Sequence, residues 1–154
     1  MILKIYLVRH GEALSPDIDP EQGLSPAGVE GIEKLSKFLA GNSFPLSAIL
    51  HSNKARAKQT ADILRQHLEP HLTPEEHEYL KPNAPIDDAL LRIEGSEEDL
   101  MIVSHLPFLN NLVGSLVGGD PDLLIVHFHA GTTVCLEQWD GKWAIDWVVT
   151  KSLL

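Results

Sequence analysis

Short apolar segments alternate along this chain with longer segments whose apolar residues recur at helical spacing. The short segments have the length and β-branched content of buried strands, and the longer ones match amphipathic helices. Strands that alternate with helices predict an α/β fold. We expect a three-layer sandwich in which a mostly parallel sheet carries helices on both faces. The expected strands are residues 3–8, 47–52 and 99–105, and the expected helices are residues 26–40, 54–68, 85–95 and a segment that runs from Pro107 to Gly118.

The first expected helix has start and stop signals of its own. Ser25 is a suitable N-cap, Pro26 suits the first helical position, and Gly41 suits the end. Apolar residues at helical spacing form one stripe that should face the sheet. The stripe consists of Val29, Ile32, Leu35 and Leu39.

The C-terminal part of the chain has a different pattern. Residues 132–149 predict an antiparallel hairpin with Asp140 and Gly141 at its turn, because an Asp-Gly pair between two strand-like arms is a strong hairpin signal. Large apolar residues alternate along its second arm. Residues 69–85, rich in proline and histidine, match no single element. No repeat or linker divides the chain, so we expect residues 1–154 to form one domain. The alternating residues are Trp143, Ile145, Trp147 and Val149.

The composition argues against several classes of function. The formal net charge of −10 over 154 residues disfavours general nucleic-acid binding, which requires a basic surface. No apolar run approaches the ~20 residues of a membrane-spanning helix, and the N-terminus lacks the layout of a secretory signal. We therefore expect a cytoplasmic protein without nucleic-acid or membrane partners. Cys135 is the only cysteine, which excludes an internal disulfide and a thiolate metal cage.

Cationic and imidazole side chains collect where the expected strands end. The first strand is followed by Arg9, His10 and Gly11, and the third ends in His105. The helix after the second strand carries Arg56 in its first turn, where the helix dipole favours acidic side chains. In a parallel sheet these strand ends and helix N-termini gather at one edge, where ligands bind. The arrangement predicts a pocket for a dianion such as phosphate.

Three segments, in this order, resemble the motifs of the histidine phosphatase superfamily. They are LVRHGEA at residues 7–13, RAKQTA at residues 56–61 and VSHLP at residues 103–107. The short chain is most similar to the SixA-type phosphohistidine phosphatases, a compact branch of that superfamily. One departure is Asn53, where a proline commonly precedes the second motif.

The resemblance implies a role for each matching residue. His10 would be the nucleophile that takes the phosphoryl group, and Arg9 and Arg56 would bind its oxygens. His105 would stabilise the group during transfer, and Gly11 would let the backbone turn closely beneath the nucleophile. No metal or other cofactor is implied, because the arginines would supply the charge that a metal brings. The resemblance thus predicts a metal-independent phosphatase with a phosphohistidine intermediate.

The nature of the substrate depends on whether the chain supplies a general acid. Larger members of the superfamily supply a carboxylic acid from the region after the second motif. Here that region holds Glu75, Glu76 and Glu78, none in a matching pattern, and we expect solvated loop residues. Without an acid, the best leaving group is one such as imidazole, whose reference pKa is about 6.5. The favoured partner is a phosphohistidine-bearing protein. A small phosphorylated metabolite, and a catalytically idle phosphate- or phosphoprotein-binding module, are the alternatives.

Several other residues could contribute to the expected site. His51 ends the second strand and could line the pocket, and Thr132 and Thr133 could touch substrate at the sheet edge. His127 and His129 place two imidazoles on one strand face. No third metal ligand is visible beside them, so we expect surface histidines and no metal site.

Overall fold

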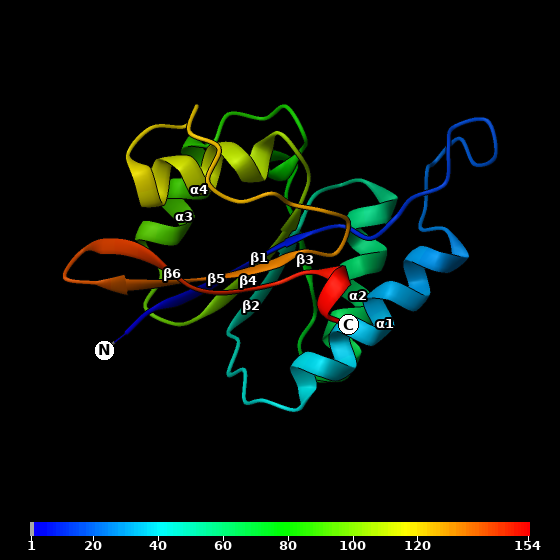
Figure 1. Ribbon diagram of the computed structural model, residues 1–154, viewed down its shortest axis with the longest axis horizontal. Coiled ribbons are helices and arrows are strands. Elements are labelled where there is room, and N and C mark those ends of the chain that lie inside the picture. The colour runs from blue at the N-terminus through cyan, green and yellow to red at the C-terminus, as the bar shows by residue number, and fades with distance from the viewer. Residues whose placement is uncertain (1) are drawn as a thin grey trace.

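The computed structural model describes residues 2–154 and consists of a sheet between two layers of helices (Figure 1). The predicted strands and helices are all present and begin and end within two residues of the predicted bounds, whereas β3 and two short 3₁₀ helices were not predicted. The strands are β1 (Lys4–Arg9), β2 (Ala48–His51), β3 (Glu75–Glu76), β4 (Leu100–Ser104), β5 (Thr133–Trp139) and β6 (Lys142–Val149). The helices are α1 (Pro26–Ala40), α2 (Ala55–Leu68), α3 (Asp87–Glu94) and α4 (Phe108–Gly118), with short 3₁₀ helices η1 (Glu78–Leu80) and η2 (Lys151–Leu153).

The sheet is mixed, with the strand order β3-β2-β4-β1-β5-β6. β1, β4, β2 and β3 are parallel neighbours, and β5 and β6 form an antiparallel hairpin beside β1. Positive φ angles at Asp140 and Gly141 form the tight turn of this hairpin. The predicted fold class, a mostly parallel sheet with a C-terminal hairpin, is confirmed. β3 lies within the unassigned residues 69–85 and is too short to show a strand period.

The central strands are buried on both faces, which explains their continuous apolar sequences. In β1, Ile5 and Leu7 pack in the cluster beneath α3 and α4, whereas Tyr6 and Val8 pack in the cluster beneath α1 and α2. Figure 1 shows the two helix pairs on opposite faces of the sheet. Burying each such aliphatic side chain stabilises the fold by about 1.5–3 kcal/mol relative to exposure. The two clusters together hold the strand ends in register.

The two tryptophans of β6 lie on opposite faces of the sheet, although a strict alternation would place them on the same face. Trp143 packs against the cluster beneath α4, and Trp147 packs against the cluster beneath α1. The pairing of β5 with β6 shifts register between Cys135 and Leu136. The extra residue at this bulge, Asp146, reverses the phase of the alternation.

Helix α1 is fastened to the segment that follows β1. Its predicted N-cap is confirmed, because the Ser25 hydroxyl accepts the backbone N–H of Gly28 at 2.9 Å. The same hydroxyl donates to the carboxylate of Glu12 at 2.9 Å. The predicted apolar stripe is wrong at Val29, which is 41% exposed. Helix α1 instead packs Gly28 against the backbone of Glu12, where only a residue without a Cβ fits.

Among residues 2–154, no helix combines the length and the apolar character that crossing a bilayer demands.

Replacing Gly28 by alanine is expected to lower the free energy of unfolding. The added Cβ would overlap the carbonyl oxygen of Glu12, and overpacking of this kind costs about 1–3 kcal/mol. Urea unfolding measures the change. Gly31→Ala is the matched control in the same helix, because its Cβ would meet no atom within 4 Å. It should stabilise the protein by about 0.5–1 kcal/mol, as alanine favours helix. Equal effects of the two substitutions would contradict the close approach at Gly28.

Candidate active site

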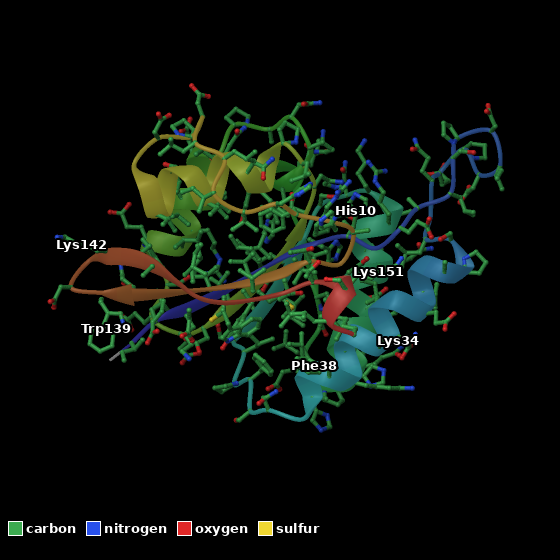
Figure 2. The ribbon with its side chains drawn as sticks, viewed as in Figure 1. His10, Lys34, Phe38, Trp139, Lys142 and Lys151 are labelled. Carbon is green, nitrogen blue, oxygen red and sulfur yellow. The ribbon has the colours of Figure 1, made fainter. Side chains whose placement is uncertain are left out.

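The site lies where β1 and β4 end side by side. The backbone N–H of His10 donates to the carbonyl of Ser104 at 3.1 Å, which joins the residue after β1 to the last residue of β4. The rings of His10 and His105 are consequently 4.8 Å apart between centroids. In Figure 2, His10 lies at the opposite end of the sheet from the hairpin turn, where Trp139 and Lys142 are labelled. The parallel sheet therefore brings the two motif histidines together.

The contacts of His10 determine which ring nitrogen is free to react. Its Nδ1 lies 2.8 Å from the carbonyl oxygen of Gly11. A carbonyl only accepts, so Nδ1 must carry the proton and Nε2 keeps its lone pair. Burial, aided by the charges of Arg56 and Arg9 and opposed by the Gly11 contact, lowers the pKa of His10 to about 4. The imidazole is therefore neutral near pH 7, as a nucleophile requires.

Gly11 contributes space beneath the nucleophile, and its φ is not positive. A Cβ at this position would lie 2.8 Å from Cγ1 of Ile32, so the close packing of α1 under the strand end excludes larger residues. The backbone N–H of Gly11 donates to the Thr60 hydroxyl at 3.0 Å, and that hydroxyl donates to the carbonyl of Arg56 at 2.8 Å. These bonds fasten the first turns of α2 to the backbone of the nucleophile.

Two arginines give the site its positive charge. Arg9 is half-buried, and its Nη1 donates to the carbonyl of Phe128 at 2.8 Å while its buried Nε has no partner. Burial lowers the pKa of Arg9 and of Arg56, but guanidinium groups remain charged in proteins. Within residues 2–154, neither arginine forms an ion pair with a carboxylate. The charge is thus available for an anion, and planar guanidinium groups suit phosphate oxygens.

His105 is buried beside His10, and its two nitrogens have different surroundings. Nε2 lies 2.6 Å from the hydroxyl of Ser52, and Nδ1 is buried without a partner. Burial, followed by the neighbouring charges of His10 and Arg56, lowers the pKa of His105 to about 3. The ring is therefore neutral near pH 7. Ser52 was not among the site residues predicted from the sequence. Its position directly after the second strand, four residues before Arg56, is the signal that could have identified it as a site residue.

The other candidates near the sheet edge use their polar groups internally. His51 is buried, and its Nδ1 donates to the carbonyl of Ser52 at 2.8 Å. The hydroxyl of Thr132 accepts the backbone N–H of His129 at 2.9 Å, and Thr133 donates to a nearby backbone carbonyl. These contacts order the loop that leads into β5, whose backbone also pairs with Arg9.

His127 and His129, which flank Phe128 in the sequence, are both exposed. The rings of His127 and His129 lie 4.2 Å apart between centroids. Within the described part of the chain, no group of three or more His, Cys, Asp or Glu side chains is placed to hold a metal ion.

The three glutamates after α2 occupy different environments. Glu75 and Glu76 form β3 and are exposed, and Glu75 contacts His77 at 3.3 Å. Glu78 is exposed as well, but it lines a surface hollow of about 540 Å³. Lys54 lines the same hollow, and its charge is one of the causes that lower the pKa of His105. The remaining lining residues are Tyr79, Lys81, Pro82, Asn83, Ala84, Pro85 and Asp88.

Comparison with known proteins gives a family match over the part of the chain that carries Arg9, His10 and Arg56, and this match ends before His105. The family model for the histidine phosphatase superfamily (branch 1) matches residues 5–81. The mitochondrial serine/threonine-protein phosphatase PGAM5 of Mus musculus is 31% identical over 84 residues, which are 54% of this chain and 29% of that protein. The chain therefore corresponds to less than a third of that relative's length.

Solved structures match over nearly the whole fold. The protein histidine phosphatase SixA complexed with tungstate superposes with a TM-score of 0.82 at 22% identity, covering 97% of this chain and 98% of that one. A SixA structure from Agrobacterium tumefaciens superposes with a TM-score of 0.79 at 23% identity, covering 96% and 97%. At such identities the likeness shows a shared fold.

The free energy of unfolding is expected to fall as the pH is lowered from about 6.5 to 4. In the unfolded chain the pKa of His10 returns to about 6.5, whereas in the folded protein it is about 4. Between these values the unfolded state binds a proton that the folded state does not, so acid favours unfolding.

The measurement is urea unfolding at a series of pH values, with the His10→Gln variant as comparison. Glutamine keeps a neutral polar side chain, so the variant should lose the part of the slope that His10 contributes. An identical slope in both proteins would contradict a lowered pKa at His10.

Proposed function

The chain belongs to the histidine phosphatase superfamily, and on that basis we propose that it is a metal-independent phosphatase that carries the phosphoryl group on His10. One observation carries this proposal. A neutral imidazole whose Nδ1 is bonded to the carbonyl of Gly11 lies in a buried site whose two arginines have no carboxylate partner among residues 2–154. Phosphoryl transfer depends on positioning and on positive charge around the transferred group, and this arrangement supplies both.

The first half of the reaction forms a covalent intermediate. The lone pair on Nε2 of His10 attacks phosphorus, and the bond from phosphorus to the leaving group breaks. The leaving group departs with the electron pair and takes a proton from solvent. Arg9 and Arg56 hold the phosphoryl oxygens, since bidentate contacts with guanidinium groups both orient the group and balance its charge. The proton on Nδ1 stays hydrogen-bonded to the carbonyl of Gly11.

The second half of the reaction releases phosphate. A water molecule attacks phosphorus, loses a proton to solvent, and displaces Nε2 of His10. The imidazole leaves as the neutral ring with which it began, because its surroundings disfavour a second proton. Inorganic phosphate then departs and the site is ready for another turnover.

The favoured substrate is phosphohistidine on a protein. The transfer passes the phosphoryl group from one imidazole to another, so the bonds broken and formed are of the same kind. Imidazole accepts a proton from water near neutral pH and needs little help to depart. The absence of an assigned general acid in the sequence motifs is compatible with such a substrate. An idle binding module is disfavoured, because it would have no need of a nucleophile held in its reactive protonation state.

A phosphate ester is the second candidate substrate, either a small phosphorylated metabolite or a phosphorylated hydroxyl on a protein. The position of Glu78 supports it, because a carboxyl group in the hollow next to Lys54 could protonate a departing alkoxide. The name of the relative PGAM5, a serine/threonine-protein phosphatase, describes substrates with such leaving groups.

His10→Ala is expected to abolish turnover while the protein remains folded. In the unsubstituted protein, rapid quenching during turnover of a labelled substrate should trap phosphate on His10 in a form labile to acid and stable to alkali. Circular dichroism of His10→Ala provides the folding control. Label recovered on a serine or an aspartate would refute the proposed intermediate.

The rate should depend steeply on the leaving group if the favoured substrate is correct. General acid catalysis is typically worth ~10²–10⁴-fold, and without it an alkoxide should leave most slowly. We expect kcat/KM for aryl phosphates to fall steeply as the phenol pKa rises. Glu78→Gln should then have little effect.

Glu75→Gln serves as the matched control, because Glu75 is exposed on β3 outside the hollow. A shallow leaving-group dependence, combined with a loss of about 100-fold in Glu78→Gln alone, would identify Glu78 as a general acid. That result would favour the phosphate esters.

A further inference from the structure

The contact between Ser52 and His105 bears on which nitrogen of the His105 ring carries the proton. Ser52 is fully buried and His105 is 2% exposed, so the 2.6 Å contact between the hydroxyl and Nε2 is shielded from solvent. Two arrangements would give this distance. Either Nε2 carries a proton and donates it to the hydroxyl, or the hydroxyl donates to an unprotonated Nε2.

The surrounding hydrogen bonds favour the second arrangement. The Ser52 hydroxyl oxygen also accepts the backbone N–H of Lys54 at 3.3 Å. If Nε2 donated as well, the hydroxyl proton would need an acceptor, and residues 2–154 offer it none besides His105. If the hydroxyl donates to Nε2, the hydroxyl, the Lys54 N–H and Nε2 are all paired, and only Nδ1 is left without a partner in the described residues. The first arrangement would leave both the hydroxyl proton and Nδ1 unpaired. Because buried polar groups in proteins rarely lack partners, the second arrangement is favoured and the proton of the neutral ring belongs on Nδ1.

We propose that Ser52 is a positioning residue that holds His105 in its Nδ1–H tautomer, so that Nδ1 donates a hydrogen bond to the transferred phosphoryl group. Nδ1 is buried and has no partner in the protein, which leaves it free for a ligand. The ring lies 4.8 Å from that of His10, within reach of a group bound to it. Phosphoryl oxygens only accept hydrogen bonds, so an unprotonated Nδ1 would repel them. This inference rests on the proposed function.

The two histidines would then share a tautomer and have opposite roles. Gly11 holds the proton of His10 on Nδ1 and frees Nε2 as the nucleophile. Ser52 occupies Nε2 of His105 and frees Nδ1–H as the donor. The low pKa of His105, about 3, means that the donor is neutral near pH 7. Protonation therefore cannot substitute for the correct tautomer, and the Ser52 hydroxyl decides whether a donor faces the phosphoryl group.

The first test measures the tautomer directly in the free protein. Two-bond ¹H–¹⁵N correlation spectra of the histidine-labelled protein at pH 7 distinguish Nδ1–H from Nε2–H rings. We expect His105 as the Nδ1–H tautomer and a shift of its Nδ1 signal on addition of inorganic phosphate. An Nε2–H tautomer in the unsubstituted protein would overturn the proposal, whatever the variants do. Because this test needs no turnover, it is independent of the proposed catalytic activity.

The second test removes the hydroxyl. Ser52→Ala should move His105 toward the Nε2–H tautomer and lower kcat, with little change in KM, because the lost hydrogen bond strengthens in the transition state. Removing a donor to a developing anion costs about 10²–10³-fold, and we expect a smaller loss of roughly 10–100-fold because the ring itself remains. Ser52→Thr keeps the hydroxyl and should keep the Nδ1–H tautomer and most of the rate. Unchanged kcat and tautomer in folded Ser52→Ala would overturn the proposal.

Two matched controls separate positioning from loss of a buried hydroxyl. Ser104→Ala removes a fully buried hydroxyl one residue before His105, which donates to the carbonyl of Leu80. Ser36→Ala removes another within α1, which donates to the carbonyl of Ile32. Both should leave the tautomer of His105 unchanged, and Ser36→Ala should also leave kcat unchanged. A tautomer change in all three variants would mean that packing, and not the Ser52 hydroxyl, sets the proton position.

Discussion

The pairing of β1 with β4 is the contact on which the rest of the site depends. These strands run parallel in register from Ile5 and Leu100 to Arg9 and Ser104, and the next residues are the two motif histidines. Residues separated by 95 positions in the chain thus have rings whose centroids lie 4.8 Å apart. Apolar side chains on both faces of the strands stabilise the pairing, and each face is covered by its own pair of helices.

The charges at the candidate site favour the binding of an anion. The chain as a whole is acidic, with a net charge of −10, yet Arg9 at the end of β1 and Arg56 in the first turn of α2 have no carboxylate partner in the described residues. Burial keeps both histidines neutral beside these charges. Under the proposed mechanism, a dianion would find fixed positive charge, a neutral nucleophile and a neutral donor, which is how preorganised sites stabilise developing charge.

The site also contains polar atoms that the fold leaves without partners. Nε of Arg9 and Nδ1 of His105 are both buried and have no hydrogen-bond partner among residues 2–154. A buried donor without an acceptor typically costs about 1–3 kcal/mol. Both belong to residues that contact or face the expected phosphoryl position. The free energy that they cost in folding is recoverable when a ligand oxygen accepts from them.

The sequence was enough to predict the α/β class and the hairpin turn, and it indicated candidate site residues whose roles stay predictions. Alternating apolar patterns report burial, and the three motifs report residue types that suit phosphate. The sequence could not predict β3, the reversed face at Trp147 or the exposure of Val29. Each of these depends on a contact between segments distant in the chain, such as the bulge beside Cys135 and the approach of Gly28 to Glu12.

The same division applies within the site. The motif pattern alone indicated His10, Arg9, Arg56 and His105, because their side-chain chemistry suits phosphate wherever the fold brings them together. The contact of Nδ1 of His10 with the carbonyl of Gly11, the contact of Ser52 with His105 and the different positions of Glu75 and Glu78 were decided by tertiary structure. Protonation and access depend on which atoms lie within hydrogen-bonding distance and which are buried. Those distances exist only once the strands have paired.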